Sequence, residues 1–302
     1  MIDGALLLDK AVGESSNAAL QRAKRLFGAA KAGHAGTLDP LASGLLVVLF
    51  GEATKFAAML LDSDKEYLAT LRLGEKTRTG DAEGEVLERR PVAASEADID
   101  AALAAFRGDI EQLPPMHSAL KRAGTPLYRL ARRGETVERA RRRVAIHALE
   151  RLRYASPVLE LRVRCSKGTY VRTLAEDLGE ALGTLAHLAA LRRTGSGRFR
   201  VADAPTLEAL EAMSAEERRR RVLPLARLLE DLPRAELDAS AEARLRNGQQ
   251  LRLSGVGEGL CALYRSDGAV IGLGRGEADG LLRPVRLTRS SGQAADKHRK
   301  TL

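Results

Sequence analysis

Residues 34–44, with the sequence HAGTLDPLASG, hold the side chain best suited to chemistry in this chain. Asp39 precedes a proline, which restricts it to an extended or turn conformation, and Gly36 and Gly44 flank it. Because glycine allows a backbone to approach a ligand closely, this segment could present the carboxylate to a substrate. The carboxylate could serve as a nucleophile or as an electrostatic stabiliser. Asp-Pro turns are also common structural features, so the pattern alone leaves a purely structural role open.

The cysteines and histidines indicate chemistry without a metal or redox cofactor. The two cysteines, Cys165 and Cys261, are too few for a disulfide framework or a Cys-based zinc cluster, and both lie in apolar, strand-like segments. The five histidines are scattered, with no HExxH and no i,i+4 pair. The glycines near the C-terminus match neither a dinucleotide fingerprint nor a P-loop. We therefore expect no metal site, no cofactor and two buried structural thiols.

The charge of the chain points to a polyanion as its partner. The 302 residues include 49 Lys and Arg against 40 Asp and Glu, a net charge of +9. Residues 121–143 carry nine basic and two acidic residues, a local charge of +7. Gly124, Pro126 and Gly134 predict a mobile protrusion there rather than a rigid helix. Such a segment is usually a solvated face, but its high density of positive charge favours contacts with phosphates.

The apolar patterns predict the elements that position Asp39. A buried strand over residues 45–50 follows the motif, and residues 65–73 alternate so that Tyr67 lies on the inward face of a second strand. Further strands are expected at 145–154 and 158–165, a polar loop at 74–94, and a helix over 170–182. Residues 232–234 resemble a linker to a small, glycine-punctuated β-rich domain, and residues 290–302 are expected to be disordered. The fold class is therefore α+β.

No segment suggests secretion or a membrane. The first residues, MIDGALLLDK, carry an acidic residue within a short apolar run, unlike a signal peptide. The longest apolar run, residues 45–50, is far too short to span a bilayer. We expect a cytoplasmic protein that does not contact a membrane.

Several motifs, in order along the chain, resemble those of the TruB family of pseudouridine synthases. The matching segments are residues 4–10 (GALLLDK), 15–17 (SSN), 31–44 (KAGHAGTLDPLASG), 51–55 (GEATK), 64–67 (DKEY), 73–81 (LGEKTRTGD), 165–174 (CSKGTYVRTL) and 191–194 (LRRT). One departure is Ala11, where the family usually has proline after the lysine. The resemblance is sharp over residues 1–230 and looser beyond them.

The resemblance implies a fold and an activity. The fold would be that of a pseudouridine synthase, with a catalytic domain over residues 1–231 built on a central mixed, largely antiparallel sheet. This domain would include a basic RNA-gripping insertion at about 121–143. A PUA-like RNA-binding domain would occupy residues 235–289. The activity would be isomerisation of uridine 55 to pseudouridine in the T-loop of tRNA, with base flipping. This reaction gains no atoms or electrons, so it needs no cofactor.

The resemblance also assigns roles to residues. Asp39 would be the catalytic carboxylate, attacking either C6 of the base or C1′ of the ribose, and Arg172 would pair with it, ideally through two nitrogens. Tyr67 would stack on the target uracil and assist proton transfer at C5, although its strand pattern also fits a core residue. The remaining substrate-binding positions that the resemblance implies are His34, Asp81, Tyr170 and Leu191.

Two other functions remain open at this stage. The chain could be a pseudouridine synthase for another RNA, like the guide-RNA-dependent relatives, which need partner proteins. It could also be a non-catalytic RNA-binding or tRNA-folding protein. The compact chain and its own basic insertion favour action on the T-arm of tRNA without an obligate protein partner.

Overall fold

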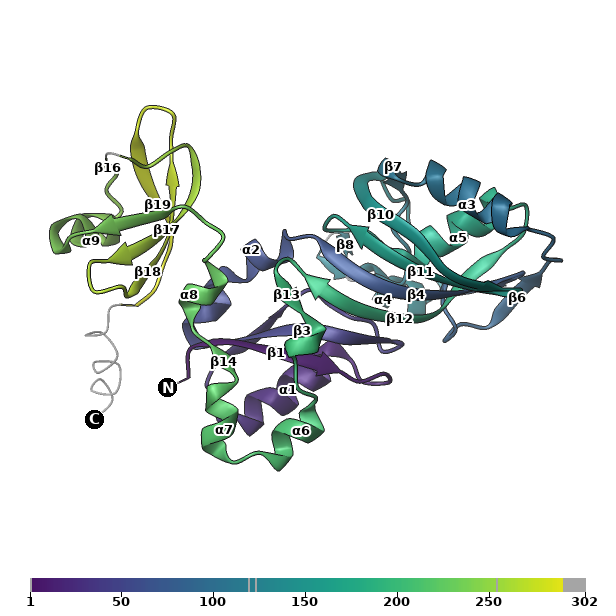
Figure 1. Ribbon diagram of the computed structural model, residues 1–302, viewed down its shortest axis with the longest axis horizontal. Coiled ribbons are helices and arrows are strands. Elements are labelled where there is room, and N and C mark those ends of the chain that lie inside the picture. The colour runs from purple at the N-terminus through teal and green to yellow at the C-terminus, as the bar shows by residue number, and fades with distance from the viewer. Residues whose placement is uncertain (1, 119, 123, 254, 290–302) are drawn as a thin grey trace.

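The computed structural model describes residues 2–118, 120–122, 124–253 and 255–289, and has two β-sheet regions joined by short helices (Figure 1). A ten-stranded sheet forms the larger region and a five-stranded sheet forms the C-terminal one. Helices pack against both sheets, so the α+β prediction is confirmed. The predicted tail, residues 290–302, lies outside the described residues. Among the residues that are described, no helix has the length and apolar character needed to cross a bilayer.

The large sheet is mixed but largely antiparallel, as predicted. Its main order is β14-β1-β3-β12-β4-β11-β10-β7, with β2 added to β3 and β13 to β12. Only β3 and β12 pair in parallel within this sheet's named ladders. The strands are β1 (Gly4–Lys10), β2 (Ala32–Ala35), β3 (Ala42–Phe50), β4 (Lys65–Leu73), β7 (Gly108–Gln112), β10 (Arg142–Ala155), β11 (Val158–Cys165), β12 (Ala186–Ser196), β13 (Phe199–Arg200) and β14 (Val222–Leu223).

The parallel pairing of β3 with β12 is short and depends on a glycine. Residues 42–44 of β3 lie beside residues 191–193 of β12. Gly44 has φ +100°, and a Cβ atom there would stand 2.3 Å from the carbonyl oxygen of Arg193. Only glycine therefore allows the two backbones to meet here. This contact brings the motif that contains Asp39 to the middle of the sheet.

Helices cover the sheet in two groups. The first is α3 (Glu96–Ala105), which starts with a capping box formed by Ser95 and Asp98, and α5 (Val171–Ala181). Their buried residues share one core with β4, β10 and β11. The second is α1 (Ser16–Leu26), capped by Ser15, which packs with α6 (Leu207–Ala212) against β1 and β3. A 3₁₀ turn (Gly51–Phe56), α2 (Ala57–Leu61), α7 (Ala215–Arg220) and α8 (Leu225–Leu228) complete this region.

Three local predictions differ from the structure in their bounds or content. The expected loop at 74–94 contains a small hairpin, β5 (Glu75–Thr77) and β6 (Val86–Arg89), whose mostly polar residues give no apolar signal. The strand expected at 145–154 starts earlier, because Arg142 and Arg143 pair with β7 while their side chains stay exposed. The last two residues of the basic insertion, about 121–143, therefore form part of the sheet. Arg234, expected in the linker, already begins a strand.

The basic insertion contains regular structure. A two-stranded hairpin, β8 (Lys121–Arg122) and β9 (Thr125–Pro126), leads into the short helix α4 (Leu127–Arg132). Leu127 is buried, which anchors the start of the helix. The insertion is thus a hairpin and a helical turn and a half, followed by irregular chain up to β10.

The C-terminal region has a core of its own and also shares one with the large sheet. It contains β15 (Arg234–Leu237), α9 (Ala239–Arg246), β16 (Leu251–Arg252), β17 (Gly259–Arg265), β18 (Val270–Gly276) and β19 (Leu281–Leu287), in the sheet order β15-β17-β18-β19-β16. The predicted β-rich region is therefore present. Ala262, Tyr264 and Leu273 pack in one cluster with Leu228 and Leu229, and Lys55 Nζ donates to the Leu287 carbonyl at 2.9 Å.

Candidate active site

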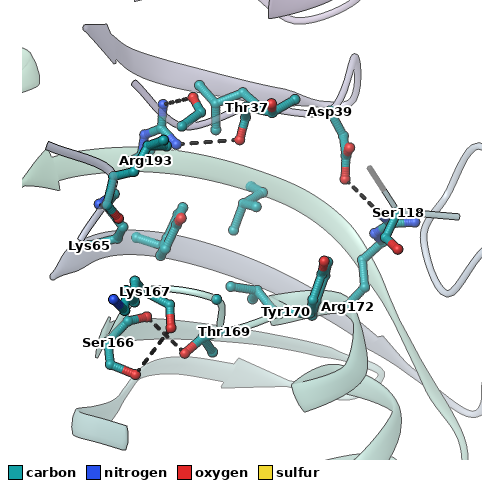
Figure 2. Close-up of a pocket in the computed structure, with 17 residues that line it drawn as sticks. Thr37, Asp39, Lys65, Ser118, Ser166, Lys167, Thr169, Tyr170, Arg172 and Arg193 are labelled. Atoms are coloured by element: carbon teal, nitrogen blue, oxygen red, sulfur yellow. Dashed lines mark hydrogen bonds and ion pairs between the residues drawn. The ribbon is translucent and has the colours of Figure 1, made fainter. Parts of the chain in front are cut away.

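A cavity of about 330 Å³ opens where the loop between β2 and β3, the strands β4 and β12 and the N-terminal end of α5 meet (Figure 2). Asp39, Tyr67 and Arg172 line it, together with Tyr170 and Leu191. These five predicted residues come from four separate segments of the chain. The fold therefore brings most of the predicted site together.

The loop that carries Asp39 is held rigidly on one side by Ser16. The Ser16 hydroxyl accepts a hydrogen bond from the Leu38 N–H at 2.7 Å and donates one to the Leu38 carbonyl at 2.8 Å. Ser16 itself is buried at the start of α1. The Asp39 carbonyl accepts from the N–H of Ala42 at 3.0 Å, while its side chain remains 46% exposed. The carboxylate is thus presented to the cavity from a fixed backbone.

Arg172 lies in the first turn of α5 and forms ion pairs with two carboxylates. One terminal nitrogen stands 2.9 Å from Asp39, and the other stands 3.4 Å from Asp81. The same nitrogens donate to the carbonyls of His117 at 2.6 Å and Thr79 at 3.2 Å. The predicted pairing of Arg172 with Asp39 is present, but through one nitrogen and not two, because Asp81 takes the other side of the guanidinium.

Two tyrosines form apolar walls of the cavity. Tyr67 lies on β4 with 9% of its surface exposed, so it belongs to the core as well as to the cavity. Burial raises the pKa of its phenol, and the charge of Arg193 opposes that rise. Tyr170 precedes α5, and the side-chain amide of the buried Gln112 accepts from its N–H at 2.9 Å and donates to its carbonyl at 3.2 Å. Burial also raises the pKa of the Tyr170 phenol.

Two predicted residues do not line the cavity. His34 lies in β2 beside Val48, its Nδ1 is buried without a hydrogen-bond partner among the described residues, and burial lowers its pKa. Asp81 is 3% exposed and sits behind Arg172, where it also accepts from the Thr79 hydroxyl. Asp81 therefore reaches the cavity only through Arg172.

Two buried cations that sequence reasoning left without a role also border the cavity. Arg193 is 1% exposed, and Lys65 is 6% exposed. The Lys65 ammonium donates to the carbonyls of Leu60, Leu61 and Ser63, and burial lowers its pKa to about 8. Lys65 could have been found from the sequence, because it lies two residues before Tyr67 and so shares its inward face.

The cavity combines one accessible carboxylate, held by a buried guanidinium, with aromatic and aliphatic walls. Such a site suits a planar, uncharged ring that stacks on Tyr67 while Asp39 approaches its edge or the atom bonded to it. Over the ranges that the structure describes, no three His, Cys, Asp or Glu side chains are grouped so that they could hold a metal ion.

Family comparison covers almost the whole chain. Residues 24–171 match the N-terminal domain of the TruB family of pseudouridylate synthases. Residues 172–232 match the C-terminal domain of tRNA pseudouridylate synthase B, and residues 233–288 match the C-terminal part of pseudouridine synthase II TruB.

Individual proteins give the same result. The chain is 55% identical over 293 residues to tRNA pseudouridine synthase B of Burkholderia mallei, covering 95% of this chain and 97% of that protein. It is 56% identical over 286 residues to the same enzyme of Thiobacillus denitrificans, covering 95% and 96%. Among solved structures, a chain of a Cbf5-Nop10-Gar1 complex superposes with a TM-score of 0.71 at 27% identity, covering 95% of this chain and 84% of that one.

Proposed function

Because the chain belongs to the TruB family of pseudouridylate synthases, we propose that it isomerises uridine 55 in the T-loop of tRNA to pseudouridine. Formation of pseudouridine in tRNA follows from its relatives at more than half identity, which are tRNA pseudouridine synthases. The observation that carries the proposal is the 2.9 Å ion pair between Asp39 and the buried Arg172 at a cavity walled by Tyr67. The assignment of position 55 is the part of the proposal that goes beyond the activity of these relatives.

The reaction needs an ionised carboxylate and a place for the uracil to turn. The bond between N1 and C1′ breaks, the base rotates, a bond forms between C5 and C1′, the C5 proton leaves and N1 gains a proton. Asp39 begins this sequence by attacking C6 of the base or C1′ of the ribose. The guanidinium of Arg172 pairs with the Asp39 carboxylate at 2.9 Å and limits its rotation.

The cavity walls hold the base outside the helical stack. Tyr67 stacks on the uracil and takes part in proton transfer at C5, and Tyr170 and Leu191 close the apolar sides. Unstacking a base costs a few kcal/mol, which contacts such as these must offset. His34, in β2, contacts the opened loop, and its half-buried ring, whose pKa is lowered by burial, suits stacking better than ion pairing.

Residues outside the cavity supply affinity for the tRNA. We assign catalysis to residues 1–231 and additional RNA contacts to a PUA-like domain at 235–289. The basic insertion, at about 121–143 with its last two residues in β10, contacts phosphates of the T-arm. These contacts do not distinguish one RNA sequence from another. Action on tRNA without a guide RNA is favoured because the relatives at more than half identity act on tRNA, whereas the Cbf5 complex is similar at 27%.

An Asp39→Asn variant tests the proposal. It keeps the side chain's shape and removes its charge, so a T-arm transcript should bind as tightly as to the wild type while pseudouridine formation falls to background. The measurement is pseudouridine at each uridine of a tRNA transcript, with a transcript carrying cytidine at position 55 as control. Substantial turnover by the variant would exclude Asp39, and product at another position in the control would overturn the assignment of uridine 55.

A further inference from the structure

Two neighbouring arginines of β12 have opposite environments. Arg192 has a side chain that is 40% exposed, and its two terminal nitrogens bind both carboxylate oxygens of Asp9 at 3.0 and 2.7 Å. Arg193 points to the other face of the strand and is 1% exposed. In the part of the chain that the structure describes, Arg193 has no carboxylate within ion-pair distance. A buried guanidinium without an acidic partner is costly, so its neighbours must compensate it.

The guanidinium of Arg193 is compensated by backbone carbonyls of the segment that carries Asp39. Its Nη2 donates to the carbonyl of Gly36 at 3.0 Å, and its Nη1 lies 3.4 Å from the carbonyl oxygen of Thr37 (Figure 2). Its Nε donates to the carbonyl of Leu45 at 2.7 Å. These three carbonyls stand on both sides of Asp39. The side chain therefore bridges the start of the loop and the strand that follows it.

Arg193 also lies on β12, the strand between β3 and β4, and its side chain lines the cavity. Its backbone is in register with Gly44 of β3 on one side and with Tyr67 of β4 on the other. The same residue thus faces the proposed stacking tyrosine and holds the loop of the proposed catalytic aspartate. Ser16 holds this loop at Leu38, so the two tethers reach it from different directions.

We propose that Arg193 is a positioning residue for the pseudouridine synthase reaction, whose planar guanidinium sets the distance between the Asp39 loop and the Tyr67 ring. The inference rests on the proposed function. Lysine could not replace arginine here, because Arg193 reaches the three carbonyls from three nitrogens held in one plane, whereas the N–H donors of an ammonium all leave a single nitrogen. Arg193 acts through Asp39 and Tyr67 and needs no contact with the RNA.

The matched variants Arg193→Lys and Arg192→Lys test this proposal, because each keeps the charge and alters one of two adjacent residues. For Arg193→Lys we expect a single-turnover rate lower by about 10²-fold, since a displacement of about 1 Å costs that much, with an unchanged Kd for tRNA. Arg192→Lys should keep both values within about twofold. A wild-type rate in Arg193→Lys, or an equal loss of rate and affinity, would overturn the inference.

A second variant approaches the same contact from the loop. Gly36 has φ +94°, and a Cβ atom there would lie 3.3 Å from Nη1 of Arg193. Gly36→Ala should therefore lower the rate through the same displacement, and the double variant with Arg193→Lys should lose much less than the product of the two single losses. Multiplying losses would show two independent effects and would overturn the inference.

The melting temperatures of the variants and the activity of the wild type serve as the remaining controls. A merely structural role would lower the melting temperature and the fraction of active protein while leaving the rate per active site unchanged, and that result would also overturn the inference. If Arg193→Lys does not fold, the rate of Gly36→Ala decides alone. Failure of the proposed function is a separate outcome, because the wild type itself would then form no pseudouridine at position 55.

Discussion

Three buried cations border the cavity, and each is compensated in a different way. Arg172 has two carboxylates, Arg193 has three carbonyls around a planar fork, and Lys65 has the carbonyls at the end of α2 and of Ser63. Carbonyl dipoles compensate a charge less completely than a carboxylate does. Of the three side chains, only lysine can release its proton within an accessible pH range.

Lys65 should therefore make stability depend on pH. Its pKa falls from 10.5 in the unfolded chain to about 8 in the folded one. Between these values the unfolded state binds the proton and the folded state does not, so the free energy of unfolding rises with pH. From about pH 7.5 to about pH 9.5 the wild type should gain about 2 kcal/mol relative to Lys65→Met.

Lys65→Arg is the control, because a guanidinium stays protonated throughout this range. Urea unfolding of the three proteins at both pH values supplies the measurement. If the wild type and Lys65→Arg change in parallel between the two pH values, then Lys65 keeps an ordinary pKa and burial has not lowered it.

At the scale of the elements, the basic insertion and the start of β10 form one exposed cationic stretch. Arg141, Arg142 and Arg143 all have exposed side chains, although the last two pair with β7 through their backbones. If these side chains contact phosphates, replacing all three by Ala should weaken tRNA binding. The slope of log affinity against log salt should become shallower by roughly 0.7 to 0.9 for each lost contact.

The matched control removes the same charge elsewhere. Arg219, Arg220 and Arg221 are also exposed, and they lie at the end of α7 and at its C-cap. Their replacement by Ala should leave the salt slope unchanged, and neither triple variant should alter the single-turnover rate at saturating tRNA. Equal slopes in both triple variants would mean that only the net charge matters and that the insertion holds no phosphates.

These elements show which features a sequence can predict. β4 was predictable because one face is buried, which leaves strict alternation over residues 65–73. β12 was not, because Arg192 and Arg193 interrupt its apolar pattern, and the burial of Arg193 depends on carbonyls from distant segments. The contact between Asp39 and Arg172 is likewise invisible to spacing and was expected only through the family resemblance. The position of Asp81 behind Arg172 emerges only in three dimensions.

At the scale of the whole molecule, the two sheet regions share part of their apolar core. Tyr264 and Leu273 of the C-terminal sheet pack in one cluster with Leu228 and Leu229 from the end of the large region. Polar contacts reinforce this seam, since the Glu52 carboxylate accepts from the N–H of Arg289 at 2.7 Å. The seam determines how rigidly the C-terminal region is held beside the large one.

A shared core should make the two regions unfold together. We expect calorimetry of the wild type to show one transition, because melting either region exposes the apolar surface of the other. Tyr264→Ala removes a ring that is 8% exposed and should cost about 3 kcal/mol, much of it at the seam. The C-terminal region should then melt first, in a separate transition.

Leu245→Ala is the control, because Leu245 is buried in the separate core of the C-terminal region. This variant should lower the melting temperature while leaving one transition. Two resolved transitions in the wild type would contradict the coupling and would mean that the two regions unfold independently.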